Sequence, residues 1–263
     1  MLSTQAFEAV TDLFHSVSGI RLTESKRALV TGRLQKLAQE RGCSIDEYVQ
    51  EITRDRDAAE VVRVIDKLTT NETYFFREPQ HFDFLAELVA QRPRGAGTLR
   101  VWSAASSSGE EAYSIAMLLG DKLGLSGWEI VGTDLSTAMV DSARRGLYPM
   151  ERVRHTPQAY LKRWCLKGRD EYEGQMLICK ELRDRVRFLP GNLVQDLPDI
   201  GHFDVIFLRN VLIYFDPPGK TDIVRRVLTR LKPAGHLLTG HAESITNLDL
   251  PVRALTAAVY VHA

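Results

Sequence analysis

Apolar residues recur with helical spacing through roughly the first 90 positions of the chain, and strand patterns are scarce there. The positions spaced three or four apart are Phe7, Val10, Leu13, Phe14, Val30, Leu34 and Leu37. Thr23 to Ser25 has the composition of a helix start, and Gly42 is typical of a helix end. Ser44 and Glu47 have the spacing of a capping box, and a further helix is expected over 57–67. We therefore predict a helical N-terminal domain over residues 1–91.

Residues 92–97 combine proline, glycine and charge, as linkers do, so we expect the domain boundary there. Short apolar runs then alternate with amphipathic segments. The predicted strands are 99–105, 128–134, 186–192, 203–210 and 236–240, and the predicted helices are 110–123, 137–146 and 220–231. This alternation predicts an α/β domain over 98–263 with a parallel, doubly wound sheet. Residues 257–262 are expected to join that sheet antiparallel, at or near an edge.

Residues 147–185 interrupt the alternation and predict an insertion. Its runs 160–166 and 175–179 would form a small antiparallel sheet around the turn between Gly168 and Gly174.

Composition narrows the class of protein. The 263 residues carry 34 Lys and Arg against 34 Asp and Glu, so no overall charge draws the chain to nucleic acid or an acidic membrane. The sequence has no basic, apolar leader and no 18-residue apolar stretch, so we expect a cytoplasmic protein without membrane insertion. Its three cysteines form no C-x-x-C pair, and no metal-binding histidine spacing occurs. We therefore expect no metal site, with His236 and His241 as ordinary strand-end and loop residues.

The turn after the first predicted strand contains small residues and leads into Glu110 and Glu111 at a helix start. Ligands of doubly wound sheets bind beyond the carboxyl ends of the strands. The turn lacks the G-x-G-x-x-G pattern, and two carboxylates would repel a pyrophosphate. A cofactor with a cationic centre and no phosphate suits them better. Equally, both carboxylates would simply stabilise the positive end of the helix.

Three other strand ends carry polar residues. Asp134 could accept hydrogen bonds from ribose hydroxyls or cap the next helix. Asn192 and Leu193 place an amide and an apolar side chain where an adenine would lie. Arg209 and Asn210 follow four apolar positions, so their polar groups need partners. For Arg209, a ligand and backbone carbonyls are both possible partners.

The stretches 68–78, 101–111 and 203–216 resemble the chemotaxis receptor methyltransferases, the CheR family, and the resemblance extends over nearly the whole chain. It implies a Rossmann-like fold that binds S-adenosylmethionine and methylates glutamate side chains of chemoreceptors. It also implies a cofactor site made of Asn71, Thr73, Arg77, Glu111, Asp134, Asn192, Leu193, Arg209 and Asn210. The sequence departs from the family pattern at Ala112, usually proline, and at Leu208, often cysteine. Both changes leave the polar groups in place.

Methyl transfer to a carboxylate depends mainly on positioning, since glutamate is already ionised at neutral pH. Arg77 and Tyr214 are the candidates for steering the incoming carboxylate, and Arg77 could instead bind the carboxylate of the cofactor. Lys26, Arg33 and Lys36 form a basic flank on the expected second helix. This flank either meets an acidic helical receptor bundle or is an ordinary solvated face.

The resemblance also implies that the insertion could bind the C-terminal pentapeptide of a receptor as an added strand. We expect the protein to be a monomer. Basic residues Arg163, Lys167 and Arg169 would favour an acidic peptide, whereas the acidic residues of the same loop would repel it. Without that ligand, the insertion is a structural flap. The rival functions are a methyltransferase acting on a small molecule or RNA, and a cofactor-binding regulatory module without turnover.

Overall fold

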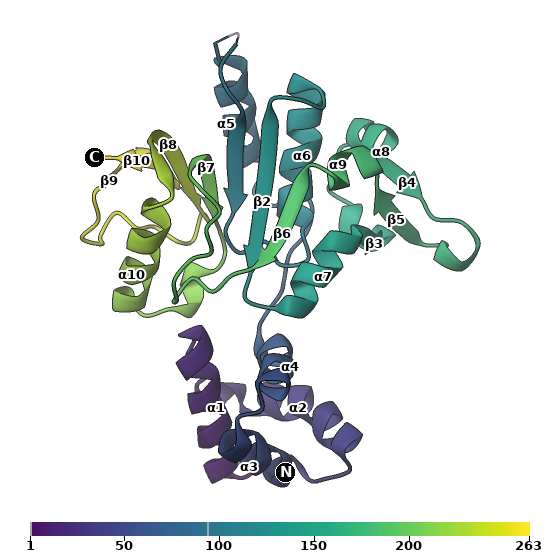
Figure 1. The fold of residues 1–263 in the computed structure, drawn as a ribbon, viewed down its shortest axis with the longest axis vertical. Helices are drawn as coiled ribbons and strands as arrows, with labels where there is room; N and C mark the ends of the chain where they lie inside the picture. The colour runs from purple at the N-terminus through teal and green to yellow at the C-terminus, as the bar shows by residue number, and fades with distance from the viewer. Residues whose placement is uncertain (1, 94) are drawn as a thin grey trace.

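The computed structural model describes residues 2–93 and 95–263, and Arg94 of the expected linker lies outside the described residues. A group of helices at the N-terminus lies below an α/β unit that carries a small sheet at its side (Figure 1). The helices of the lower group are α1 (Thr4–Ser18), α2 (Arg27–Arg41), α3 (Ile45–Asp55) and α4 (Ala58–Leu68). Within the described part of the chain, no helix is long and apolar enough to cross a membrane.

Helices α1 to α4 share one apolar core, as the helical spacing predicted. Phe14, Leu34 and Tyr48 are fully buried in it. The capping box at Ser44 and Glu47 is confirmed, since each side chain accepts a hydrogen bond from the backbone amide of the other residue. Gly42 ends α2 in the left-handed conformation, as predicted. The start signal near Thr23 instead precedes a short 3-10 helix, Glu24–Lys26, and α2 follows that turn.

Helix α5 (Gln80–Ala90) belongs to the core of the α/β unit rather than to the helical group. Phe82, Leu85 and Val89 are buried in the same cluster as the central strands. This packing differs from the division expected at 92–97, because an apolar helical face in the sequence does not identify which neighbour buries it. We infer that the domains divide near residue 70, after α4.

The main sheet is doubly wound, as predicted, and its strand order is β6-β2-β1-β7-β8-β10-β9. Strands β6, β2, β1, β7 and β8 are parallel, and β10 runs antiparallel to β8, as predicted. Beyond β10 lies an edge strand, β9, that the sequence analysis did not predict. The strands are β1 (Leu99–Ser103), β2 (Trp128–Asp134), β6 (Val186–Pro190), β7 (Phe203–Leu208), β8 (Leu231–Thr239), β9 (Val252–Thr256) and β10 (Val259–His262).

Helices cover both faces of this sheet (Figure 1). Successive strand residues alternate between the two cores. Val101 packs with α5 and α6 (Glu110–Leu123), while Trp102 packs with α10 (Pro217–Leu228). Helix α7 (Thr137–Arg145) also belongs to the layers of this sheet. Helix α10 begins earlier than predicted, since Asp216 caps it and two prolines occupy its first turn.

The insertion forms an antiparallel sheet of order β3-β5-β4. Its elements are β3 (Leu147–Pro149), the 3-10 helix Met150–Val153, α8 (Gln158–Trp164), β4 (Cys165–Lys167), the 3-10 helix Asp170–Tyr172, β5 (Gln175–Ile178) and α9 (Lys180–Arg183). The predicted strand 160–166 is wrong over most of its length, because α8 occupies that run and buries Trp164. Gly168 is required in the turn, since a Cβ there would stand 1.9 Å from the carbonyl oxygen of Tyr172.

Candidate functional site

A cavity of about 480 Å³ lies between the helical group and the carboxyl ends of β1, β2 and β7. Its walls include Phe14 and Leu68 from the helical group and Ala104 from the α/β unit. The predicted cofactor and substrate residues that line it are Asn71, Thr73, Arg77, Glu111, Asp134, Asn192, Leu193, Arg209, Asn210 and Tyr214. The fold therefore gathers these residues from five separate segments into one site.

The turn after β1 separates the two glutamates that follow it. Glu111 lines the cavity and accepts a hydrogen bond from Ser103 at 2.7 Å. Glu110 is fully buried and pairs with Arg152 of the insertion at 2.7 Å. The two carboxylates thus do not act as a pair: Glu110 joins the insertion to α6, and Glu111 faces the site. The buried hydroxyl of Ser107, on the cavity wall, has no hydrogen-bond partner among the described residues.

Asp134 ends β2 with both carboxylate oxygens near the turn after β1. One oxygen accepts from the amide of Ser107 at 2.7 Å, and the other accepts from the amide of Ser136 at 2.9 Å. Burial raises the pKa of Asp134 to about 6. The alternative role as the cap of α7 is wrong, because Ser136 fills that position with its own side chain.

Asn192 and Leu193 lie in the turn after β6, where the helical group meets the α/β unit. The Asn192 amide donates to the carbonyl of Val17 at 2.7 Å and accepts from the amide of Val194 at 3.1 Å. Leu193 is buried on the same wall of the cavity. Asn192 therefore fixes the relative position of the two walls, whereas Leu193 provides an apolar surface.

Arg209 is the most deeply buried charge of the site, with 1% of its side chain exposed. Its guanidinium donates to Glu111 at 2.8 Å and to Glu78 at 3.1 Å. It also donates to the backbone carbonyl of Arg77, so of the partners considered from the sequence the backbone carbonyl occurs, beside two carboxylates. Asn210 is left-handed, with φ 57°, and donates to Glu78 at 3.2 Å.

Arg77 and Tyr214, the candidates for steering the substrate, both line the cavity. The Arg77 guanidinium donates to the carbonyl of Glu72 at 2.9 Å and lies 5.7 Å from the centre of the Tyr74 ring. Burial raises the pKa of the Tyr214 hydroxyl, and the charge of Arg77 opposes that shift. Both side chains thus reach the same part of the cavity from different segments.

Asn71 and Thr73 come from the segment that joins the helical group to α5. Asn71 donates to the Thr69 hydroxyl at 3.3 Å, and the carbonyl of Thr73 accepts from Arg152 at 3.5 Å. These two hydrogen bonds hold the segment at Asn71 and at Thr73.

The basic flank of α2 divides into different environments. Arg33 lines the cavity and donates to the carbonyls of Leu68 and Thr69, both at 2.9 Å, at the end of α4. Lys26 is exposed at the cavity rim, and Lys36 is exposed outside it. Arg33 therefore has a structural role that the sequence analysis did not predict.

Sequence analysis also missed two carboxylates, Glu78 and Glu243. Glu78 directly follows Arg77 and binds Arg209, while Glu243 is buried in the loop after β8. The rule that ligands bind beyond strand ends could have identified Glu243, because β8 is parallel to β7. Glu78 had no such signal, since no strand precedes it.

The residues of the cavity suit S-adenosylmethionine. A volume of about 480 Å³ falls within the usual range of ligand pockets, roughly 300–1,000 Å³. Asp134 stands where a strand-end carboxylate accepts from ribose hydroxyls. Glu111 supplies negative charge for a cationic ligand, and the unpartnered Ser107 hydroxyl can bind a further polar group.

Two family comparisons divide the chain as the packing does. The CheR methyltransferase all-alpha domain matches residues 5–69, and the CheR methyltransferase SAM binding domain matches residues 71–261. Chemotaxis protein methyltransferase 2 of Pseudomonas aeruginosa is 39% identical over 258 residues, covering 97% of this chain and 91% of that protein. The chemotaxis protein methyltransferase of Salmonella typhimurium is 38% identical, covering 94% of this chain and 86% of that protein. The chain therefore belongs to the CheR methyltransferase family, and its α/β unit is the S-adenosylmethionine-binding domain of that family.

Proposed function

We propose that this protein transfers a methyl group from S-adenosylmethionine to glutamate side chains of chemoreceptors, for adaptation in chemotaxis-type signalling. The relatives are named chemotaxis protein methyltransferases, and the resemblance over the whole chain extends that activity here. The observation that carries the proposal is the single cavity lined by both the cofactor candidates and the steering candidates Arg77 and Tyr214. The bound cofactor supplies an electrophilic methyl group on a sulfonium sulfur.

The contribution of the protein is orientation. A glutamate with a pKa of about 4.3 is ionised at neutral pH, so no general base is required. Holding the reacting groups in line can lower the barrier by roughly 7–11 kcal/mol. Arg77 would orient the incoming carboxylate through charge-assisted hydrogen bonds, and Tyr214 would do so through its hydroxyl. A grip that stabilised the bound carboxylate too strongly would slow transfer.

The roles of Arg77 can be separated kinetically. If Arg77 steers the substrate, Arg77→Ala raises KM for receptor and leaves the affinity for S-adenosylhomocysteine unchanged. If Arg77 binds the carboxylate of the cofactor, the affinity for S-adenosylhomocysteine falls instead. Tyr214→Phe removes only the hydroxyl, so it tests the steering role of Tyr214 in the same way.

The function is tested by incubating the enzyme and labelled S-adenosylmethionine with the cytoplasmic fragment of candidate receptors. We expect a base-labile methyl ester, located on glutamates by mass spectrometry. Label on RNA or a small molecule instead of receptor would favour the first rival function. Binding of S-adenosylhomocysteine without transfer to any acceptor would favour the regulatory module.

The state and location of the enzyme extend the proposal. The residues that line the cavity come from one chain, which supports action as a monomer. We also propose that the enzyme acts in the cytoplasm. Sedimentation equilibrium with and without cofactor tests the first part, and cell fractionation tests the second.

Docking of the receptor C-terminal pentapeptide is a further part of the proposal. Strand β4 is an edge of the small sheet and carries the exposed Leu166, so a peptide could pair with it as an added strand. Arg163 already pairs with Asp121 at 2.6 Å, which leaves Lys167 and Arg169 for an acidic peptide. Tethering would raise the local receptor concentration toward about the millimolar range.

Titration of the enzyme with receptor pentapeptides tests docking, and Lys167→Glu with Arg169→Glu should weaken it. No binding to any pentapeptide, together with undiminished methylation of a tail-deleted receptor, would make the insertion a structural flap.

A further inference from the structure

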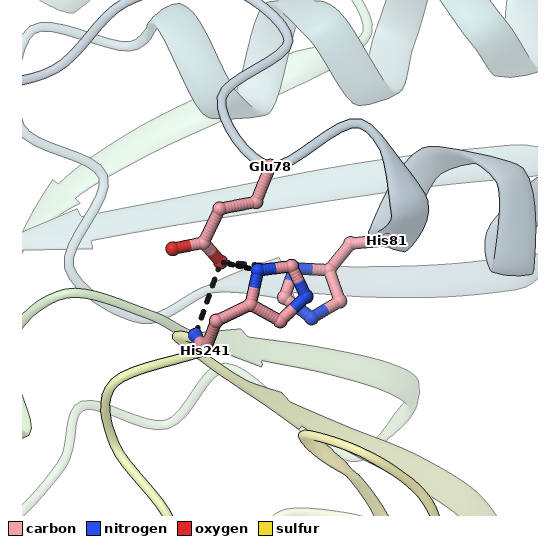
Figure 2. A group of neighbouring side chains, drawn as sticks. All are labelled: Glu78, His81 and His241. Carbon is pink, nitrogen blue, oxygen red and sulfur yellow. Dashed lines mark hydrogen bonds and ion pairs between the residues drawn. The ribbon is translucent and has the colours of Figure 1, made fainter.

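Glu78, His81 and His241 form a cluster next to Arg209, which lines the cofactor cavity. His81 lies in the first turn of α5, and His241 lies in the turn after β8 (Figure 2). A carboxylate oxygen of Glu78 stands 3.4 Å from Nδ1 of His81 and 3.7 Å from Nδ1 of His241. One ligand atom from each residue lies within 4.8 Å of the other two. Two segments far apart in the sequence thus present three potential metal ligands to one point.

His81 is the unusual member of the cluster. The residue is 1% exposed, and neither ring nitrogen has a hydrogen-bond partner in residues 2–93 and 95–263. A buried polar atom without a hydrogen-bond partner costs free energy. The protein contacts of this imidazole therefore do not account for the burial of its two nitrogens. Burial and the charge of Arg209 lower the pKa of His81 to about 4, which keeps the ring neutral. A neutral imidazole is the form that coordinates a metal ion.

The spacing suits a small transition-metal ion. Zinc binds nitrogen and oxygen ligands at about 2.0–2.1 Å with tetrahedral geometry, so neighbouring ligand atoms lie about 3.3–3.4 Å apart. The two distances from Glu78 are 3.4 and 3.7 Å. His241 keeps 42% of its side chain exposed, which provides an entry path and room for a water ligand.

Arg209 opposes a cation here, because it donates to the same Glu78 oxygen at 3.1 Å. Two further carboxylates offset it: Glu111 binds Arg209, and Glu243 accepts from the amides of Asn210 and Gly240 beside His241. One guanidinium therefore stands among three carboxylates. A dication would balance the remaining negative charge. The Glu78 oxygen that faces the histidines also accepts from the backbone amide of His241 at 3.3 Å, so the ion would replace one of its two hydrogen bonds.

We propose that Glu78, His81 and His241 bind one first-row transition-metal dication of the zinc class, with water completing its coordination. Two imidazoles favour zinc, cobalt, nickel or copper over magnesium or calcium, which prefer oxygen ligands. The bound ion clamps the start of α5 to the loop after β8. Spacing patterns in the sequence gave no sign of this site, because its ligands come from separate segments.

Cobalt spectroscopy of the tag-free, metal-stripped full chain tests the site. We expect one equivalent of Co²⁺ to produce the visible absorption bands of a nitrogen- and oxygen-ligated ion, and Zn²⁺ to abolish them by displacement. His241→Ala should lower the Co²⁺ affinity by at least about tenfold, because it removes a direct ligand. The matched control is His202→Ala, at an exposed histidine before β7 and therefore at the opposite end of that strand from Arg209.

Thermal unfolding gives a second readout, independent of methyl transfer and of receptor. Zn²⁺ should raise the midpoint of the wild type and of His202→Ala by mass action, and should raise that of His241→Ala much less. The absence of cobalt bands, equal affinity in wild type and His241→Ala, or bands of a thiolate-ligated ion would overturn the proposal. Because S-adenosylhomocysteine binding is measured separately, failure here leaves the proposed methyl transfer standing.

Discussion

The carboxylate of Glu243 accepts a hydrogen bond from the backbone amide of Asn210, at 2.5 Å. The same group accepts from the amides of Gly240 at 2.9 Å and Ile213 at 3.1 Å. Asn210 needs this support because its φ of 57° lies in the left-handed region, which non-glycine residues rarely adopt. One buried carboxylate therefore holds the loop that carries Arg209 and Tyr214 on the cavity wall.

Glu243→Gln should reduce the rate of methyl transfer and destabilise the fold. The substitution keeps the size of the side chain but replaces one accepting oxygen with a donating NH₂ group, which would face a backbone amide. A buried donor without a partner costs about 1–3 kcal/mol. Urea unfolding and receptor methylation measure the two effects, with exposed Glu8→Gln as the control. Unchanged rate and stability would show that the loop holds its conformation without Glu243.

Arg209→Lys should impair both cofactor binding and transfer. Lysine has a single ammonium group, so it cannot bind Glu111, Glu78 and the carbonyl of Arg77 with the geometry of a guanidinium. Lysine keeps the positive charge, so the loss is that of the buried acceptors left unpaired, about 1–3 kcal/mol of stability for each. A double-mutant cycle with Glu111→Gln measures the coupling of the pair by unfolding and by calorimetry. Additive effects would show that the two side chains act independently.

The control for Arg209→Lys is Arg225→Lys, because Arg225 is half-exposed and pairs with the fully exposed Asp249 at 3.3 Å. Exposed pairs of this kind contribute little to stability, about 0–1 kcal/mol. Equal losses in the two variants would contradict the role assigned to burial at Arg209.

Elements with a complete local pattern were predicted with the bounds that the structure has. Helix α6 (Glu110–Leu123) has acidic residues in its first turn and glycines on both flanks, and β2 (Trp128–Asp134) is a short apolar run. Strand β9 was missed because its residues are almost all exposed and show no apolar alternation. Helix α5 lies in the region predicted to be helical, but no separate helix was predicted over its residues. Its packing in the core of the α/β unit had no signal, since amphipathicity identifies a buried face and not its neighbour.

In the candidate site too, residues with a local sequence signal were predicted, and residues that depend on tertiary packing were missed. Glu111, Asp134 and Arg209 come directly after parallel strands or in the next helical turn, where general rules expect ligand-binding residues. Glu78 and Glu243 meet the site only through tertiary folding. Arg33 has a basic, helical local pattern, and its contact with the carbonyl of Leu68 spans 35 positions. Such partners depend on how separate elements dock, and no local spacing encodes that.

Asp134→Ala should weaken S-adenosylhomocysteine binding by about 1.5–3 kcal/mol, the range for hydrogen bonds to a charged group. The proposed ribose contact uses the ionised carboxylate, and burial raises the pKa of Asp134 to about 6. Wild-type affinity should therefore be constant at higher pH and fall as the pH drops through about 6, by up to about tenfold for each further unit.

Calorimetry across this pH range checks both parts of the expectation. Asp134→Asn is the matched variant: it should bind more weakly at neutral pH and lose the pH dependence between about pH 5 and 8. An unchanged affinity in Asp134→Ala would rule out the ribose contact. An unchanged pH dependence in Asp134→Asn would assign the titration to another group, such as Glu111, whose pKa burial also raises.

The basic flank of α2 is best tested without Arg33. Reversing that charge would place a carboxylate against the carbonyls of Leu68 and Thr69 and damage the cavity itself. Lys26→Glu with Lys36→Glu changes only exposed side chains, so cofactor affinity should stay as in the wild type. If the flank meets an acidic receptor surface, methylation of receptor by this double variant should fall at low salt, mainly through a slower association.

Wild-type methylation should also fall as salt screens the attraction, with a Debye length of about 10 Å at 0.1 M. Equal rates for wild type and variant at low salt would make the flank an ordinary solvated face.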